Sequence, residues 1–279
     1  MAAAIAAWAG AAPAAAQSPP APNGLPAGFV YLADIAPGIR QDLRYFSDRN
    51  FLARPAKGYE SGECILTRPA AVALARVQER LGPGYALEVL DCYRPVTAVA
   101  DFATWAADLA DQKAKARHFP TIDKARLFEA GFLSRDSRHS RGTAVDVTII
   151  ALGTGDVTGR ALVAARPCED HVPAPAHIHD SSAAELDFGT GYDCFHELSA
   201  TAHPGVGHLA RRNRDWLVTE MARAGFRNYA REWWHFELAG APIGVALDFP
   251  VRARPPRLLQ PPAPATRSER SEAADRRVP

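Results

Sequence analysis

The stretch SRHSRGTAVDVTII, residues 137–150, joins a polar turn to an apolar run and decides the fold of the chain. The run Ala144–Ile150 predicts a buried strand, because β-branched side chains suit a pleated and covered surface. Asp146 interrupts this run, and a buried carboxylate is costly unless it is paired or binds a metal ion. We therefore expect a partner for Asp146. An arginine or lysine is one alternative, and a metal ion shared with His139 of the preceding turn is the other.

A second motif, Glu232-Trp233-Trp234-His235, supplies another carboxylate and another imidazole around two tryptophans. Glu232 and His235 are three residues apart, whereas side chains on one face of a regular strand are separated by even spacings. We therefore expect a bulge or a tight turn that directs both side chains to one place. Taken alone, the motif is also compatible with a core aromatic pair that has two polar neighbours.

Together the two motifs contain the groups of a metal-dependent hydrolase. Zinc binds imidazole nitrogen and carboxylate oxygen, and catalytic zinc sites combine three protein ligands with a water molecule. His139, Asp146 and His235 can form such a set. A carboxylate near the metal can carry the proton of the water to a leaving amine, and Glu232 is the candidate. The residue types thus predict one zinc ion per chain with a general base beside it.

Arg94 is a candidate for stabilising negative charge in this site. It follows Asp91-Cys92-Tyr93 at the end of an expected strand and precedes Pro95, which starts an expected helix. A cation is wanted for an anionic tetrahedral intermediate or for a substrate carboxylate. The alternative is that Arg94 only pairs with Asp91.

The periodicity of the chain predicts helices and strands without regular β-α-β alternation. The expected elements, in chain order, are a helix from Thr67 to Gly82-Pro83-Gly84, a strand at 86–93, a helix from Pro95 that contains Phe102, Trp105 and Leu109, the strand at 144–150, a long loop at 153–204, a helix at 211–224, and a strand or irregular strand at 226–238. This mixture indicates an α+β fold with a central antiparallel sheet flanked by helices.

Length, charge and composition restrict the class of protein. The chain has 279 residues, 47% of them hydrophobic, which is enough for one substantial core at 27–251. The formal net charge of +1 argues against a nucleic-acid binder, and no internal run is long and apolar enough to span a membrane. The Pro- and Arg-rich tail, 252–279, is expected to be disordered.

The Ala-rich leader and Pro-rich spacer at 1–26 resemble a secretory signal, with a small-residue cleavage pattern at Ala14-Ala15-Ala16 but no basic start. We expect a periplasmic or secreted protein, and a cytoplasmic one if the leader is not a signal. The cysteines, which are Cys64, Cys92, Cys168 and Cys194, are even in number and suit an oxidising compartment. Pairing neighbours in sequence, Cys64 with Cys92 and Cys168 with Cys194, is the preferred one of three connectivities. Four reduced core cysteines are the alternative.

The motifs together resemble a known family. Ser137-x-His139-x-x-Gly142-x-Ala144-x-Asp146, Glu232-Trp233-Trp234-His235 and Asp91-x-Tyr93-Arg94-Pro95 are similar to the D-alanyl-D-alanine dipeptidases. These are zinc metallopeptidases known from vancomycin resistance and related to zinc D,D-carboxypeptidases. The resemblance covers most of the body, including 188–193 and 247–251, and implies a D,D-peptidase or hedgehog-like fold with the zinc site at the sheet.

The resemblance also implies roles for individual residues. It gives zinc ligands at His139, Asp146 and His235, a general base at Glu232, an intermediate-stabilising cation at Arg94, a carboxylate for the substrate ammonium at Asp193, and pocket-lining positions at Ser137 and Tyr59. The implied substrate is a small D,D-dipeptide, which is cleaved to two D-alanines.

Two departures from the family pattern concern specificity. Arg138 stands where we expect a smaller residue, and 160–185 resembles an insertion beside Asp193. Two other functions are therefore kept as alternatives. One is a D,D- or L,D-carboxypeptidase acting on longer peptidoglycan stem peptides, and the other is a non-catalytic peptidoglycan-binding module. Retention of Glu232 with all three ligands argues against the second.

Overall fold

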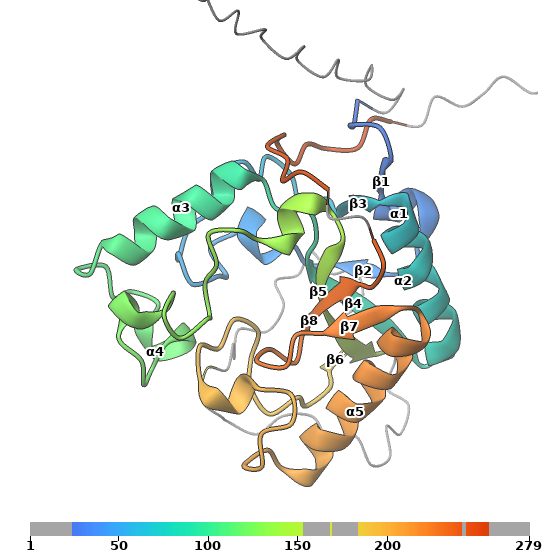
Figure 1. The fold of residues 1–279 in the computed structure, drawn as a ribbon. Coiled ribbons are helices and arrows are strands. Elements are labelled where there is room, and N and C mark those ends of the chain that lie inside the picture. Colours follow the sequence, from blue (N-terminus) through green and yellow to red (C-terminus); the bar gives the residue numbers. More distant parts are fainter. Residues whose placement is uncertain (1–23, 153–167, 169–183, 242–243, 257–279) are drawn as a thin grey trace, which may run out of the picture.

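A six-stranded sheet forms the centre of the molecule (Figure 1). The computed structural model describes residues 24–152, 168, 184–241 and 244–256. The sheet has the strand order β2-β4-β5-β8-β7, with β6 beside β5. Its strands are β2 (Arg40–Gln41), β4 (Tyr85–Asp91), β5 (Ala144–Ala151), β6 (Ala184–Glu185), β7 (Phe226–Asn228) and β8 (His235–Leu238). Each pair is antiparallel except β2 with β4, which is parallel. The expected α+β class is confirmed, with one parallel pair added at the edge.

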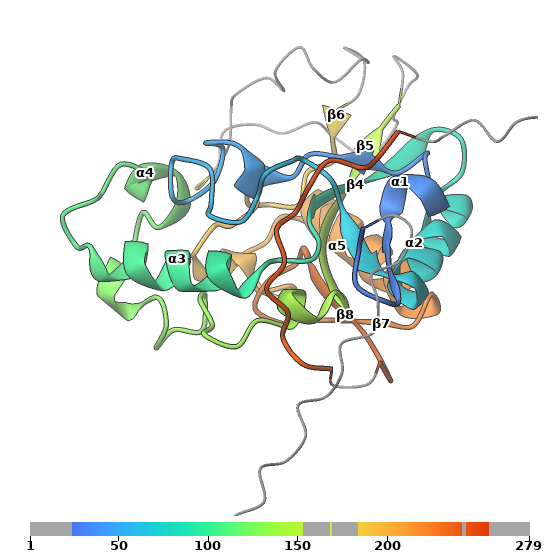
Figure 2. The same cartoon turned by 90° about the horizontal axis from the view of Figure 1, so that it is seen from above.

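Helices α2 (Arg68–Leu81) and α5 (His208–Arg223) contact each other and pack on the sheet through an apolar cluster. Helix α3 (Val96–Ala107) and the short α4 (Lys115–His118) lie at the opposite end of the molecule, as Figures 1 and 2 both show. The remaining elements are α1 (Leu32–Ile35), a separate hairpin of β1 (Phe29–Tyr31) and β3 (Ile65–Thr67), and single 3-10 turns at Arg44–Phe46, Lys124–Arg126, Arg138–Arg141 and Glu197–Ser199.

Two apolar clusters make up the core of the described residues. The first joins α2, α5 and the sheet and includes both Trp233 and Trp234. The second is rich in aromatic side chains and joins α3 to the loops around it, with Tyr45, Phe51 and Phe102 in mutual ring contact. Side chains from both clusters meet around the cavity that is described below.

Two details differ from the sequence-based expectation. Helix α3 ends at Ala107, so Leu109 lies beyond it and is 55% exposed. The segment 226–238 forms two antiparallel strands, β7 and β8, joined by a turn at 229–234. Of the expected leader at 1–26 and the expected tail at 252–279, residues 1–23 and 257–279 lie outside the described residues. Within the described part of the chain, no helix has the length and apolar character needed to cross a membrane.

One buried carboxylate in the sheet predicts a pH-dependent stability. Glu88 of β4 is 6% exposed, and burial, with a contribution from Asp42, raises its pKa to about 7. The unfolded chain releases this proton near pH 4.5, so the folded chain holds more protons between these values, and the free energy of unfolding falls as pH rises through this window.

We therefore expect Glu88→Gln to raise the free energy of unfolding at pH 8 by up to about 3 kcal/mol and to have little effect at pH 4.5. Urea unfolding at the two pH values measures this difference. An equal effect at both values would mean that the charge of Glu88 is not the cause.

Candidate active site

Strand register places three polar residues in a row across the middle of the sheet. Asp91 of β4 lies opposite Asp146 of β5, and Asp146 lies opposite His235 of β8. Directly opposed residues on neighbouring antiparallel strands have their Cβ atoms about 5 Å apart. Residues separated by up to 144 positions in the chain, from 91 to 235, therefore meet in one place.

His139 completes a cluster that has the composition of a metal site. One ligand atom from each of His139, Asp146 and His235 lies within 4.8 Å of the others. Oδ1 of Asp146 is 3.0 Å from Nδ1 of His235 and 3.3 Å from Nε2 of His139. Burial alone would raise the pKa of Asp146, but the two imidazoles outweigh burial and hold this pKa well below its ordinary value. The carboxylate is therefore ionised and able to bind a cation.

His139 is held in position by a short 3-10 turn. Ser137 caps this turn, because its Oγ accepts a hydrogen bond from the backbone N–H of His139 at 3.3 Å. Gly142 ends the turn with φ 66°, and a Cβ at this position would lie 2.3 Å from the Phe29 ring. Both the left-handed backbone and the close packing thus require glycine here.

Each imidazole has a second partner that fixes its orientation. Nδ1 of His139 is 2.7 Å from the carbonyl oxygen of Cys92, so this nitrogen carries the proton and Nε2 faces the cluster. Cys92 is in turn bonded to Cys64. Nε2 of His235 is 3.5 Å from a carboxylate oxygen of Glu237. Burial would lower the pKa of His235, but Asp146 and Glu237 raise it to about 10.

The turn between β7 and β8 brings Glu232 to the same place. The side-chain amide of Asn228 donates hydrogen bonds to the carbonyls of Glu232 and His235, both at 3.0 Å. Trp233 points away into the core, where its ring stacks on Phe188 at 4.2 Å. The expected tight turn is therefore present, and it resolves the odd spacing of Glu232 and His235. Burial raises the pKa of Glu232 to about 7.

Arg94 is a buried cation beside the cluster. Its Nη2 is 2.8 Å from Asp91 and 3.7 Å from Asp146, and its guanidinium lies 4.9 Å from the centre of the Tyr45 ring. Burial would lower its pKa, but Asp91 and the nearby tyrosines hold it well above the ordinary value. Arg94 does pair with Asp91, and it lines the cavity at the same time.

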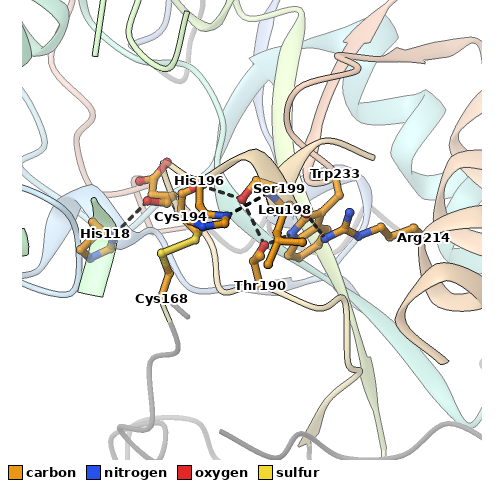
Figure 3. Close-up of a disulfide and its surroundings, with 10 residues drawn as sticks. His118, Cys168, Thr190, Cys194, His196, Leu198, Ser199, Arg214 and Trp233 are labelled. Carbon is orange, nitrogen blue, oxygen red and sulfur yellow. Dashed lines mark hydrogen bonds between the residues drawn. A yellow bond between two sulfur atoms is a disulfide. The ribbon is translucent and has the colours of Figure 1, made fainter. Parts of the chain in front are cut away.

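Asp193 reaches the cavity from the loop after β6. It adopts φ 53°, a left-handed conformation that aspartate tolerates better than most residues, and its Oδ2 accepts a hydrogen bond from Tyr45 at 2.7 Å. The next residue, Cys194, is bonded to Cys168. The disulfide lies between His118 on one side and Ser199 on the other (Figure 3). Both disulfides match the pairing preferred from the sequence.

These residues surround a cavity of about 260 Å³ at the junction of the two apolar clusters. The lining includes the whole predicted set except Tyr59, namely Arg94, Ser137, His139, Asp146, Asp193, Glu232 and His235. Tyr59 is not among the residues that line this cavity, because its hydroxyl is directed to Asp91 and donates a hydrogen bond there at 2.6 Å. It supports Asp91, which in turn holds Arg94.

Sequence reasoning missed four residues of this site. Tyr45 contacts Asp193 and Arg94, Tyr192 donates to Asp146 at 2.8 Å, Glu237 faces His235, and Asn228 organises the turn. Glu237 could have been found, because it lies two positions after His235 and therefore on the same face of the strand. Tyr192 lies in the segment 188–193 of the family resemblance but received no role there, and nothing local in the sequence indicates Tyr45.

Two imidazoles, one buried and one partly buried, share a cavity with two carboxylates and an arginine, and this set defines a candidate metallohydrolase of the α+β class. Comparison with protein families identifies the family. The model described as D-ala-D-ala dipeptidase, Peptidase_M15, matches residues 26–159 and 174–252, and the chain belongs to this metallopeptidase family.

Relatives support this membership. The chain is 32% identical over 216 residues to a protein named D-alanyl-D-alanine dipeptidase from Enterococcus faecalis (strain ATCC 700802 / V583), and the alignment covers 77% of this chain and 93% of the relative. It is also 32% identical over 225 residues to a protein of the same name from Streptomyces coelicolor (strain ATCC BAA-471 / A3(2) / M145), with 80% of this chain and 98% of the relative covered. One from Escherichia coli (strain K12) is 30% identical over 214 residues, covering 76% and 86%. The resemblance seen in the motifs is confirmed.

The family match also corrects the extent of the expected insertion. Within the matched region, 26–252, it leaves residues 160–173 unmatched, so 174–185 belong to the part shared with the family. Cys168 lies in the unmatched stretch, and the rest of that stretch lies outside the described residues.

Proposed function

We propose that the chain is a zinc-dependent dipeptidase that hydrolyses D-alanyl-D-alanine to two D-alanines. The observation that carries this proposal is the convergence of His139, Asp146 and His235 in a cavity that also contains Glu232, Arg94 and Asp193. The names of the relatives support the choice of substrate.

The three ligand residues fit zinc. Two imidazole nitrogens and one carboxylate oxygen are its usual donors at catalytic sites, and the bond from His139 to the Cys92 carbonyl leaves Nε2 free to bind a metal. A proton and a metal ion compete for Nδ1 of His235, so binding of the metal releases that proton. When bound, zinc would acidify a water molecule and polarise the scissile carbonyl.

Glu232 is proposed as the general base. Its pKa of about 7 suits proton transfer at neutral pH, because a base is most effective when its pKa lies near the working pH. It takes the proton of the attacking water and delivers it to the nitrogen of the departing D-alanine. The buried Trp234 lines the same cavity as Glu232.

Arg94 is proposed to stabilise the oxygen on which negative charge develops. Its position is fixed on one side by Asp91, which Tyr59 holds, and on the other by the rings of Tyr45 and Phe102. Because the guanidinium is held in place before the reaction, it needs no reorganisation when negative charge develops, and it therefore stabilises the transition state.

Asp193 is proposed to bind the substrate ammonium, and Ser137 to line the pocket. Burial raises the pKa of Asp193 well above its ordinary value, and Asp146 adds to this effect. A substrate ammonium would supply the positive charge that favours the ionised form. An acylated nitrogen carries no such charge, so this site would reject longer peptides.

A comparison of two substrates tests the function. Zinc-loaded protein is assayed on D-alanyl-D-alanine and on a stem pentapeptide that ends in the same dipeptide. We expect kcat/KM at least about 100-fold higher for the dipeptide, since the acylated nitrogen of the pentapeptide offers Asp193 no positive charge to bind. A chelator should abolish the activity, and added zinc should restore it.

Faster cleavage of the pentapeptide would instead establish a carboxypeptidase. Binding of peptidoglycan fragments without hydrolysis would establish the non-catalytic alternative.

Export and the extent of the catalytic domain are proposed on separate grounds. Two disulfides are common in exported proteins and rare in the cytosol, which supports a periplasmic or secreted location. We place the catalytic domain at 27–251, because the chain still pairs at Val251, which bridges to Tyr59.

A further inference from the structure

Arg138 lies between the capping Ser137 and the ligand His139, and the proposed mechanism does not use it. Its side chain lines the active-site cavity and is 43% exposed. Among the described residues it forms one long ion pair, with its Nε 3.7 Å from a carboxylate oxygen of Glu237. Because the backbone of this turn is fixed by the cap and by Gly142, the base of the side chain is held at the mouth of the cavity.

The roles proposed so far give the ammonium of a dipeptide a partner, Asp193, but give its C-terminal carboxylate none. Among the described residues that line it, the lysines and arginines number two, Arg94 and Arg138. The proposed function already assigns Arg94 to the oxygen of the scissile bond, and its guanidinium also contacts Asp91, Asp146 and two aromatic rings. Arg141, which is close in sequence, is directed to Asp136 at 2.7 Å and lines a neighbouring cavity but not this one, whereas Arg138 lines both.

We propose that Arg138 binds the C-terminal carboxylate of the substrate. This inference rests on the proposed dipeptidase function. Asp193 and Arg138 would then hold the two charged ends, with the scissile bond over the cluster of His139, Asp146 and His235 between them. A guanidinium can bind a carboxylate with two parallel hydrogen bonds, which gives orientation as well as affinity.

The Glu237 contact is compatible with this role. At 3.7 Å and with both side chains partly exposed, the pair is weak, and a substrate carboxylate can replace it. Glu237 would keep its other partner, since its second oxygen lies 3.5 Å from His235. No charge is left buried and unpaired when the substrate enters.

The test compares D-alanyl-D-alanine with its C-terminal amide, which has the same scissile bond and ammonium but no terminal charge. Wild-type enzyme should prefer the acid, and Arg138→Gln should raise KM for the acid by about 10- to 100-fold with little change for the amide. Arg138→Lys should keep part of the preference for the acid.

Arg227→Gln is the matched control, because Arg227 is exposed, lies on β7 and lines the neighbouring cavity, not this one. It should leave both substrates unaffected. The zinc content of Arg138→Gln is measured as well, because loss of the Glu237 pair could act through His235.

Three outcomes overturn the inference: an equal loss on acid and amide, unchanged KM for the acid, or a loss of zinc that accounts for the whole effect. A wild-type enzyme that hydrolyses neither substrate would refute the proposed function, whereas an active wild type with an unaffected Arg138→Gln would refute only the role of Arg138.

Discussion

Glu232→Ala is expected to lower kcat by about 100- to 10,000-fold while the protein keeps its zinc. Glu232 is not one of the three clustered ligand residues, so its removal leaves the metal site intact. The loss falls on kcat because proton transfer takes place in the transition state and contributes little to substrate binding. Steady-state kinetics and elemental analysis of the same preparation measure the two quantities.

Glu232→Gln is the closer variant, because it keeps the shape of the side chain, whereas the bond from Asn228 to the backbone carbonyl of Glu232 is available in both variants. We expect it to be as inactive as Glu232→Ala. Undiminished hydrolysis by either variant would show that Glu232 is not the general base. A loss of zinc in both variants would show that Glu232 contributes to metal binding.

His139→Ala is expected to abolish both zinc binding and hydrolysis. The substitution removes one of the three proposed ligands and also a partner that lowers the pKa of the buried Asp146. Zinc content after dialysis, together with activity at saturating zinc, measures the effect.

Glu237→Gln is the control for this variant, because we expect it to weaken metal binding and not to abolish it. It leaves the three ligands in place and removes only the carboxylate that faces His235. Loss of such a partner typically lowers metal affinity by about 10- to 100-fold, so excess zinc should restore its activity. Full zinc binding by His139→Ala would show that the cluster is not the metal site.

Much of the site could be predicted from the sequence because its chemistry is carried by residue types in short motifs. Asp146 stands out as a carboxylate within a β-branched run, and Glu232 and His235 as polar groups around two tryptophans. The strand at 144–150 and the helix from Thr67 follow from local pattern, and the structure has both. The odd spacing of Glu232 and His235 even required the turn that is found.

Contacts between distant segments could not be predicted in this way. Tyr59 was expected in the pocket, but its hydroxyl reaches Asp91, because the packing of the loop and not the motif directs it. The roles of Tyr45 and Tyr192 have no local signal, since each side chain acts on a partner far away in the chain, Asp193 and Asp146 respectively.

The sequence by itself determined which groups are available: two imidazoles, the carboxylates, Arg94 and cysteines in even number. Tertiary structure alone decided that Asp91, Asp146 and His235 stand opposite one another on three neighbouring strands, and that Asp193 turns toward Tyr45. The physical reason is that side-chain identity is a local property, whereas strand register and loop packing are set by the burial of residues that lie far apart in the chain.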